Sequence, residues 1–477
     1  MTLIVASVHG TPPPNVANAD MIEIRADTID VHSVPSILGS TTLPTIFTVR
    51  SVEEGGNFSG SDEQRIEVLT AALTCSNPPT YLDIEYEFFK NQPWILDDLP
   101  LGDCDVILSW HDMKGRPKDL FQKAAAMQDV AGISVVKMAW RARSLRDNLD
   151  AFELLQARQQ PMIALCMGPY GKMSRILAPK FGGFATFASI GGREATADGQ
   201  LDVEELRGLY NFDTINADTF VFGVIGEQVN HSASPLFHNA AFAAAGTNAV
   251  YLPFPIPAGW EHLKATTLSV MHASILDFKG ASITIPHKEN MAKLVAEEGG
   301  LIDKACEDIG ALNTIGIGKT LSGTNTDSEA IATLIRSAKR VLILGAGGVA
   351  RAAISAAINN GSSVIVVARR TEQAKKLATV FGCEHGSAAC HAIDMVINCT
   401  PVGMRGGPSE EGDPLQLLLP SFELTSDIQV FDTVYDPEET PLLLQAKEMG
   451  CTRITGADLF RKQAAAQQRF WASCTLR

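Results

Sequence analysis

Short apolar runs separated by stretches with helical spacing dominate the first 215 residues of the chain. The runs are rich in Val, Ile, Leu and Phe without strict alternation, which is typical of parallel strands covered on both faces. Eight of them occur, at 2–8, 21–26, 44–49, 80–86, 105–110, 132–138, 161–167 and 183–190. Helical spacing is found between them, for example at 62–75, 117–130 and 144–158. Eight strand–helix units predict an α/β fold with an N-terminal (β/α)8 barrel over 1–215.

Two further α/β patterns follow a polar, turn-rich segment at 208–218, which we interpret as a short linker. The first occupies 219–330, with apolar runs at 220–226, 249–256, 280–286 and 314–318 and helical stretches at 235–246 and 288–299. The second occupies 331–477 and begins with a buried strand at 340–344, a glycine-rich turn, a helix and a strand at 363–368. These patterns predict two more α/β domains.

The glycine-rich turn indicates a dinucleotide-binding Rossmann fold. Its residues are Gly345, Ala346, Gly347, Gly348, Val349 and Ala350, which place G-x-G-x-x-A between a strand and a helix. Glycines let the backbone approach a pyrophosphate closely, and the helix N-terminus adds partial positive charge. The next strand ends in Arg369, Arg370 and Thr371 rather than in an acid, which favours NADP over NAD. A solvated basic loop is the alternative interpretation of the two arginines.

Two ionisable residues stand at the ends of buried runs in the predicted barrel, namely His111 and Lys137. A buried lysine loses its charge or finds a partner, and a desolvated amine is a nucleophile. A nearby histidine is a candidate proton carrier, so the pair indicates imine chemistry on a carbonyl substrate. In such barrels the chemistry gathers at the C-terminal strand ends. The residues at those ends are Glu23, Arg25, Arg50, Glu85, His111, Lys137, Met167 and Gln200.

Composition narrows the classes of function and partner. The net charge of −15 argues against a nucleic-acid partner, so an anionic substrate must be held by local arginines or lysines. No basic flank of a signal peptide and no apolar run of spanning length occurs, so we expect no membrane partner. Nine scattered cysteines without a Cys-x-x-Cys pair favour free thiols over disulfides or a zinc site, and hence a cytoplasmic protein without a metal.

The N-terminal section resembles type I 3-dehydroquinate dehydratase over nearly its whole length. The motifs that carry the resemblance are Glu23-Ile-Arg25-Ala-Asp27, Phe47-Thr-Val-Arg50-Ser-Val-Glu-Glu54-Gly55-Gly56, Asp83-Ile-Glu85, Ser109-Trp-His111-Asp112, Val136-Lys137, Met167 and Ser174-Arg175. The resemblance implies an imine between Lys137 and the 3-keto group, proton transfer by His111, and orientation of that histidine by Glu54. The substrate contacts that it implies are Glu23, Arg25, Arg50, Met167, Arg175 as the carboxylate clamp, Thr196 in place of a usual serine, and Gln200.

From about 219 onward the chain resembles shikimate dehydrogenase. The resemblance rests on Asn230-His-Ser232-Ala-Ser234-Pro235, Thr284-Ile-Pro286-His-Lys288-Glu289, Gly310-Ala-Leu-Asn313-Thr314, Asn325-Thr326-Asp327, the glycine-rich turn, Asn398-Cys-Thr400-Pro401-Val-Gly403-Met404, Asp432-Thr-Val-Tyr435 and Gly456 to Gln463. A Lys288–Asp327 pair can relay the hydroxyl proton while hydride moves between nicotinamide and substrate. The resemblance implies substrate contacts at Ser232, Ser234, Thr284, Asn313, Tyr435 and Gln463, and cofactor contacts at Asn398, Thr400 and Gly456. It also implies a substrate-binding domain at 219–330, a Rossmann NADP-binding domain at 331–477, and a last helix that returns to the former.

The two resemblances describe consecutive steps, in which 3-dehydroquinate becomes 3-dehydroshikimate and NADPH then reduces it to shikimate. Small-molecule substrates are therefore the expected partners, and the oligomeric state stays open. One alternative is a dehydrogenase half that acts on quinate, with the barrel working in the degradative direction. Another is that one half is a non-catalytic module that binds a metabolite. Both halves keep their lysine together with a histidine or an aspartate, which argues against the second alternative.

Overall fold

The computed structural model describes residues 1–10, 12, 16, 18–191, 199–230, 232–335, 338–386 and 392–475. The chain divides into two compact units. The first comprises Met1–Gly223, Gln228–Ile256 and Ala265–Phe278, and the second comprises Val224–Glu227, Pro257–Lys264 and Lys279–Arg477. Thr196, one of the predicted substrate contacts, lies outside the described residues.

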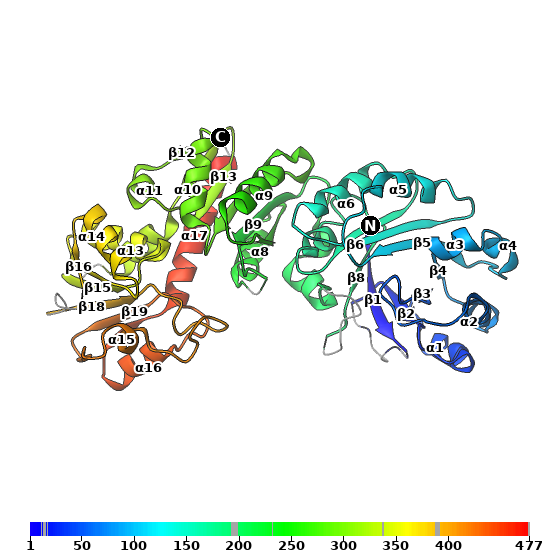
Figure 1. Cartoon of the computed structure of the whole chain (residues 1–477), viewed down its shortest axis with the longest axis horizontal. Coiled ribbons are helices and arrows are strands. Elements are labelled where there is room, and N and C mark those ends of the chain that lie inside the picture. Colours follow the sequence, from blue (N-terminus) through cyan, green and yellow to red (C-terminus); the bar gives the residue numbers. More distant parts are fainter. Residues whose placement is uncertain are drawn as a thin grey trace. The chain divides into compact units, whose positions relative to one another are not determined.

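The first unit contains a parallel sheet that curls into a barrel (Figure 1). Its strands are β1 (Leu3–His9), β2 (Met21–Arg25), β3 (Thr45–Thr48), β4 (Tyr81–Glu85), β5 (Asp105–Asp112), β6 (Val135–Arg141), β7 (Met162–Met167) and β8 (Ala185–Ala188). Their order is β7-β6-β5-β4-β3-β2-β1-β8. At the seam, the backbone N–H of Phe184 donates to the carbonyl oxygen of Met162, with an N···O distance of 2.8 Å. The eight predicted strands and the barrel are confirmed.

The interior of the barrel changes from apolar to polar along the strands. One buried apolar layer is formed by Val5, Met21, Ile46, Ile107, Val135, Ile163, Leu165, Ala185 and Phe187. Because side chains alternate along a strand, residues two positions further on point to the same side. Those residues include Ser7, Glu23, Thr48, Ser109 and Lys137. Polar groups therefore begin directly above the apolar layer, toward the C-terminal strand ends.

Helices follow the barrel strands and cover their outer faces. They are α1 (Val34–Leu38), α2 (Asp62–Thr74), α3 (Tyr86–Asn91), α4 (Ile95–Asp98), α5 (Leu120–Gln128), α6 (Asp147–Gln156) and α7 (Lys172–Ile176). Within the segment 208–218, Tyr210, Phe212 and Ile215 are buried although most of the other residues are exposed. The interpretation of this segment as a linker stays a prediction.

A mixed sheet of six strands follows, in the order β10-β9-β11-β13-β14-β12. Its strands are β9 (Phe220–Gly226), β10 (Ala249–Pro255), β11 (Phe278–Ile283), β12 (Leu301–Ile302), β13 (Thr314–Ile317) and β14 (Leu321–Thr324). Its helices are α8 (Ser234–Ala244), α9 (Trp260–His272), α10 (Lys288–Glu297), α11 (Lys304–Ile309) and α12 (Thr326–Leu334). Strand β13 runs antiparallel to β11 and β14. The apolar pattern did not predict β14, because this strand is short and half-exposed.

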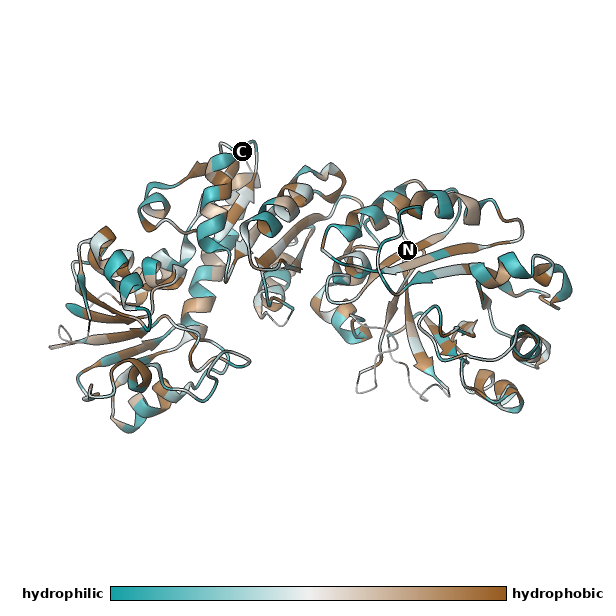
Figure 2. Ribbon diagram, in the orientation of Figure 1, coloured by the Kyte–Doolittle hydropathy of each residue, from teal (hydrophilic) through white to brown (hydrophobic). Residues whose placement is uncertain are grey.

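The third sheet is parallel throughout and has the order β17-β16-β15-β18-β19-β20. Its strands are β15 (Arg340–Leu344), β16 (Ser363–Val367), β17 (Glu384–His385), β18 (Met395–Asn398), β19 (Gln429–Asp432) and β20 (Thr452–Ile454). Its helices are α13 (Gly348–Asn359), α14 (Thr371–Phe381), α15 (Pro414–Leu418), α16 (Pro441–Glu448) and α17 (Gly456–Thr475). Figure 2 shows apolar residues along these strands. This strand order is that of dinucleotide-binding folds, which confirms the Rossmann prediction.

Helix α17 packs on β13, where the indole N–H of Trp471 donates to the carbonyl oxygen of Ile315 at 2.9 Å. None of the described helices combines the length and the apolar character needed to cross a bilayer.

Candidate active sites

Lys137 is buried inside the barrel, with 6% of its side chain exposed. It is the third residue of β6 rather than the end of a strand as predicted, because the strand continues through Arg141. Its Nζ lies 3.1 Å from Oε1 of Glu23 and 3.1 Å from Oδ2 of Asp83. The amine also lies 4.0 Å from the ring centroid of Phe187. Of the two outcomes expected for a buried lysine, finding a partner is the one observed.

Glu23 is held as a carboxylate on one side of Lys137. It accepts hydrogen bonds from the hydroxyls of Ser7 (2.6 Å) and Thr48 (3.1 Å). Burial by itself raises the pKa of Glu23, but the nearby Lys137 and Arg25 outweigh burial and lower that pKa to about 2. The negative charge next to the amine is therefore permanent at neutral pH.

Asp83 plays the matching part on the other side of the amine. It accepts hydrogen bonds from Nη2 of Arg50 (2.8 Å) and from the hydroxyl of Ser109 (2.5 Å). Burial raises the pKa of Asp83, but Arg50 and Lys137 outweigh it and hold that pKa below its usual value. Lys137 thus sits between two ionised carboxylates.

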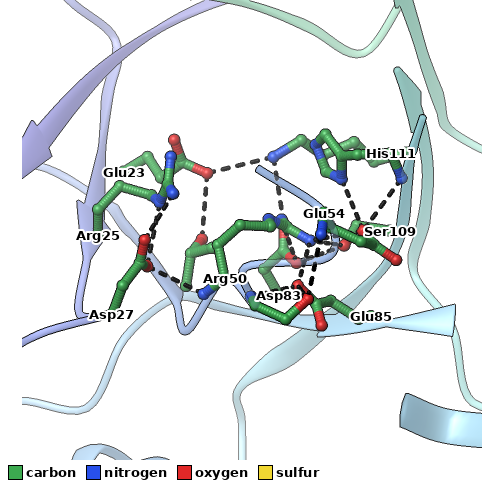
Figure 3. A network of polar contacts seen from close by, with 12 residues as sticks. Glu23, Arg25, Asp27, Arg50, Glu54, Asp83, Glu85, Ser109 and His111 are labelled. Atoms are coloured by element: carbon green, nitrogen blue, oxygen red, sulfur yellow. Dashed lines mark hydrogen bonds and ion pairs between the residues drawn. The ribbon is translucent and has the colours of Figure 1, made fainter. Parts of the chain in front are cut away.

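Arg50 joins two carboxylates of β4 to Glu54 in the turn after β3, as Figure 3 shows. Its Nη1 donates to Ser109 (2.8 Å), Glu54 (3.2 Å) and Glu85 (3.3 Å). Burial disfavours a charged guanidinium, yet the surrounding carboxylates raise the pKa of Arg50 above its ordinary value. Both terminal nitrogens therefore bind protein acceptors, although the sequence predicts Arg50 as a substrate contact.

His111 and Glu54 form a hydrogen-bonded pair at the end of β5 (Figure 3). Oε2 of Glu54 lies 2.9 Å from Nδ1 and 3.0 Å from the backbone nitrogen of His111. Burial and the nearby Arg50 and Lys137 lower the pKa of His111 well below its usual value, so the imidazole is neutral. Burial also raises the pKa of Glu54 to about 8, against the opposing effect of Arg50. A neutral imidazole is ready to accept a proton at neutral pH.

The charges of the cluster add to the effect of burial on the pKa of Glu54, because Glu85 and Asp83 raise that pKa further. Arg25 pairs with Asp27 through two hydrogen bonds of 3.2 and 2.6 Å, and Arg65 pairs with Glu85 at 2.8 Å. The cations Arg25, Arg50, Arg65 and Lys137 therefore face the carboxylates Glu23, Asp27, Asp83 and Glu85. A further buried negative charge on Glu54 would have to share Arg50 with Asp83 and Glu85.

Three other predicted contacts surround the last strands of the barrel. Met167 ends β7 and is buried. Arg175, on α7, is buried and donates from Nη1 to the carbonyl oxygen of Phe187 at 3.1 Å. Gln200 follows Gly199, where a Cβ would lie 2.3 Å from the carbonyl oxygen of Gly168. The segment that carries Gln200 thus packs closely on the residue after Met167.

A second buried pair, Lys288 and Asp327, lies in the other unit. Nζ of Lys288 is 2.5 Å from Oδ2 of Asp327, with 12% and 8% of the side chains exposed. Lys288 begins α10, and Asp327 lies in the first turn of α12. A Cβ at Gly348 would come within 3.1 Å of the Lys288 side chain. The amine–carboxylate pair therefore stands directly beside the glycine-rich turn, as the predicted chemistry requires.

Polar side chains gather next to Asp327. Nδ2 of Asn313 donates to the hydroxyl of Thr326 (3.0 Å) and to Oε1 of Gln463 (3.5 Å). Thr326 also donates to Gln463 at 3.4 Å. Thr284 is half-buried in the turn before α10. The structure thus joins Asn313 and Gln463 through Thr326, the residue before Asp327.

The remaining predicted substrate contacts are placed separately. Tyr435 is 40% exposed and packs on Phe460, with ring centroids 5.4 Å apart. Ser232 and Ser234 lie in the first compact unit, where the hydroxyl of Ser232 accepts a hydrogen bond from the backbone N–H of Ser234 at 3.2 Å. Ser234 begins α8. Their substrate roles stay predictions.

The glycine-rich turn has the geometry that a pyrophosphate needs. Gly345 has a φ of +117°, and a Cβ there would lie 2.9 Å from the carbonyl oxygen of Cys399 and 3.1 Å from Cγ2 of Thr400. At Gly347, before the N-terminus of α13, a Cβ would meet no heavy atom within 4 Å. The open side of the turn thus faces a helix N-terminus, which suits a phosphate.

The basic residues after β16 are accessible to a ligand. Arg369 and Arg370 are both exposed, and Thr371 begins α14. The arginines thus stand where the ribose end of a dinucleotide lies in Rossmann folds.

Gly456 begins α17, and a Cβ there would lie 2.1 Å from the carbonyl oxygen of Val434.

Asn398 is fully buried and supports the turn rather than reaching outward. Its Nδ2 donates to Oδ1 of Asp432 (2.9 Å), and its Oδ1 accepts from the backbone N–H (2.9 Å) and hydroxyl (2.7 Å) of Thr400. Burial raises the pKa of Asp432 to about 6. Asn398 and Asp432 together hold Thr400 against Gly345.

Some residues of the sites carry no role predicted from the sequence, although several of them lie within its motifs. Asp83 and Ser109 are the most important of them in the barrel. A signal was available, because Asp83 and Glu85 on β4, and Ser109 and His111 on β5, are two positions apart and face the same side. Strand alternation applied to both pairs predicts all four inside the barrel.

Comparisons with known proteins assign the two halves separately. A model described as type I 3-dehydroquinase matches residues 14–217. The shikimate dehydrogenase substrate binding domain matches residues 224–315, and a model described as NADP oxidoreductase, coenzyme F420-dependent, matches residues 340–405.

Curated relatives match one or both halves. The chloroplastic bifunctional 3-dehydroquinate dehydratase/shikimate dehydrogenase of Arabidopsis thaliana is 34% identical, over 94% of this chain and 77% of its own length. The NADP(+) shikimate dehydrogenase of Methanocella arvoryzae is 35% identical, over 53% of this chain and 92% of its own. A crystal structure of a shikimate dehydrogenase in complex with NADP+ is 34% identical, with a TM-score of 0.47, over 54% of this chain and 92% of its own.

Proposed function

The chain belongs to the family of bifunctional 3-dehydroquinate dehydratase/shikimate dehydrogenases, and we propose that Lys137 and His111 perform its dehydration and Lys288 and Asp327 its reduction. The enzyme converts 3-dehydroquinate to 3-dehydroshikimate and reduces this product to shikimate with NADPH. The observation that carries the proposal for the barrel is a buried lysine whose Nζ lies 3.1 Å from each of two carboxylates, on the strand next to the one that holds His111.

The dehydration follows from this arrangement. Lys137 first gives a proton to neutral His111, and its free amine attacks the 3-keto carbon. His111 returns the proton to the departing water, so that an iminium cation replaces the ammonium. Glu23 and Asp83 stabilise this cation, as they stabilise the ammonium. The iminium withdraws electrons, which makes the adjacent C–H acidic enough for neutral His111 to remove its proton. The ring hydroxyl then leaves as water with the proton that His111 has taken, and hydrolysis of the imine regenerates Lys137.

The other predicted residues of the barrel would orient the substrate and the base. Glu54 fixes the orientation of the His111 ring through the hydrogen bond to Nδ1. We assign the ring carboxylate to Arg175, whose buried guanidinium offers charge and directed N–H donors. Met167 and Gln200 would close the same end of the barrel over the substrate.

The reduction is assigned to the second unit. NADP, when bound, carries the hydride. The residues that would hold it are the glycine-rich turn at its pyrophosphate, and Arg369 and Arg370 at its 2′-phosphate. Lys288 and Asp327 hold a proton at the substrate oxygen, so that the oxygen is protonated as the carbon is reduced.

Domain limits and location are further parts of the proposal. We place the dehydratase at 1–215, the shikimate-binding domain at 219–330 and the Rossmann domain at 331–477. For the reduction, we assign binding of the carboxylate of 3-dehydroshikimate to Ser232 and Ser234. None of the eight cysteines that the structure describes forms a disulfide, which supports a reducing compartment such as the cytoplasm. The partners proposed are the small-molecule substrates.

Trapping of the imine tests the assignment of Lys137. Borohydride reduces an iminium to a stable secondary amine, so enzyme treated with 3-dehydroquinate and borohydride should carry the substrate on Lys137 in peptide mass spectra. Omission of the substrate is the control. Absence of an adduct, or an adduct on another lysine, rejects the proposed mechanism.

A further inference from the structure

Arg65 lies behind the dehydratase site, on helix α2, and is buried with 8% of its side chain exposed. Its guanidinium carbon lies 5.0 Å from the ring centroid of Phe58 and 4.8 Å from that of Phe88. Nη1 donates to Oε2 of Glu85 at 2.8 Å. Arginine suits this place because its planar guanidinium stacks on aromatic rings while it donates a directed hydrogen bond.

Glu85 connects Arg65 to the turn that carries Glu54. While Oε2 of Glu85 accepts from Arg65, its Oε1 accepts from the backbone N–H (2.8 Å) and hydroxyl (3.1 Å) of Ser51. The hydroxyl of Ser51 in turn accepts from the backbone N–H of Glu54 at 3.3 Å. Arg65 therefore fixes Oε2 of Glu85, and Oε1 of Glu85 fixes Ser51, the first residue of the turn.

The turn lies outside the named strands and helices, and it is held both by Glu85 and by a backbone bridge between Ser51 and Phe58. It leaves β3 and brings Glu54 back over the barrel, to within hydrogen-bond distance of His111. The N–H of Gly56 closes the turn by donating to the carbonyl oxygen of Ser51 at 2.7 Å. The position of Ser51 thus sets the position of the Glu54 carboxyl.

We propose that Arg65 is a positioning residue of the dehydratase: it fixes Glu85, which fixes Ser51 and so holds Glu54 where it orients His111. This inference rests on the proposed role of His111. Arg65 is remote from the substrate in this scheme, so its loss should slow proton transfer without weakening substrate binding. A cation that only links α2 to β4 would instead lower the amount of folded enzyme.

The test compares Arg65→Lys with Arg116→Lys in the full chain. Arg116 is a matched control, because it also pairs with a carboxylate, Asp150 (2.7 and 3.0 Å), and lies over a ring, Phe121 (6.0 Å). For each variant, kcat and KM for 3-dehydroquinate are measured and kcat is divided by the fraction of chains that borohydride traps. The reduction of 3-dehydroshikimate by the same preparation reports on the fold of the rest of the chain.

For Arg65→Lys we expect kcat per trapped site to fall about tenfold or more, with KM and dehydrogenase activity within about twofold of wild type. Arg116→Lys should leave all three quantities within about twofold. Ser51→Ala breaks the next connection with a smaller change of volume, and should lower kcat per trapped site about threefold or more, again without a change in KM. It keeps the test decisive if Arg65→Lys does not fold.

An unchanged kcat per trapped site in a folded Arg65→Lys enzyme overturns the inference, as does a rise in KM that exceeds the fall in kcat. If Arg65→Lys does not fold, an unchanged kcat in Ser51→Ala overturns it. Failure of the proposed function looks different, since wild-type enzyme would then yield no adduct at Lys137.

Discussion

Replacement of Glu54 offers a quantitative test of how the base His111 is held. Oε2 of Glu54 accepts three hydrogen bonds, from Nη1 of Arg50 and from the backbone and ring nitrogens of His111. Oε1 is buried and has no hydrogen-bond partner among the described residues. Because the pKa of Glu54 is raised to about 8, the carboxyl is mostly protonated at pH 7, and the accepting oxygen acts as a neutral acceptor.

The two informative variants separate geometry from charge. Glu54→Ala removes the acceptor that holds the His111 ring for proton transfer. If the two lost hydrogen bonds act on the transition state, about 2–4 kcal/mol in total corresponds to a kcat loss of roughly 30- to 1,000-fold. Glu54→Gln keeps an oxygen in the place of Oε2 and should lose at most about tenfold at pH 7, or ~1.4 kcal/mol. Its amide nitrogen has no hydrogen-bond acceptor at the Oε1 position. This lowers the stability of the folded enzyme rather than kcat.

The ratio of wild-type to Glu54→Gln kcat should also change with pH, in a direction that the pKa of Glu54 predicts. Above pH 8 wild-type Glu54 becomes a carboxylate, and its hydrogen bond from Nδ1 of His111 becomes charge-assisted and stronger. The glutamine variant cannot follow this change, so the ratio of wild-type to Glu54→Gln kcat should rise between pH 7 and 9. The assay is dehydration of 3-dehydroquinate, with 3-dehydroshikimate reduction as the internal control. A ratio that is constant with pH, or a Glu54→Gln enzyme as slow as Glu54→Ala at pH 7, refutes the reasoning.

Two further predictions concern the Rossmann domain. Arg369→Ala and Arg370→Ala should each raise the Kd for NADPH about tenfold to a hundredfold, because a charge-assisted hydrogen bond contributes about 1.5–3 kcal/mol. Fluorescence titrations should show unchanged binding of NADH. Equal weakening of both cofactors contradicts the 2′-phosphate role. Burial raises the pKa of Asp432 from 3.8 to about 6. A protonated Asp432 therefore stabilises the folded state in acid, and this contribution to the free energy of unfolding, about 3 kcal/mol in all, is lost as the pH rises through this interval. Asp432→Asn keeps acceptors for Asn398 and a partner for Thr440, so its stability gain in denaturant unfolding should grow from pH 4 to 6 and then level off; a gain independent of pH contradicts this.

Much of the architecture follows from the apolar pattern alone. Strands covered on both faces read as continuous apolar runs, and the G-x-G-x-x-A turn lies between such a strand and a helix, so the barrel and the Rossmann fold are both predictable. The segment 208–218 shows the limit of this reasoning. Its composition is polar, and only the tertiary structure shows that Tyr210, Phe212 and Ile215 are buried.

The sequence predicts which residues form the candidate sites better than it predicts how those residues are arranged. Lys137 and His111 were identified, but the end of an apolar run is not the end of a strand, and Lys137 lies inside β6. The sequence also gives no hint that Arg50 donates to protein carboxylates, because that depends on which strands become neighbours in the closed barrel. Arg65 on α2 cannot be tied to His111 from sequence, since the connection runs through two other elements.

The central claim is that one chain carries two separate catalytic lysines that act in sequence, and complementation tests it most directly. Lys137→Ala should lose dehydration of 3-dehydroquinate and still reduce 3-dehydroshikimate with NADPH, whereas Lys288→Ala should do the reverse. Neither variant alone should make shikimate from 3-dehydroquinate, and an equimolar mixture of the two should make it at a measurable rate. Shikimate formation by either variant alone, or loss of both activities in both variants, would contradict the claim.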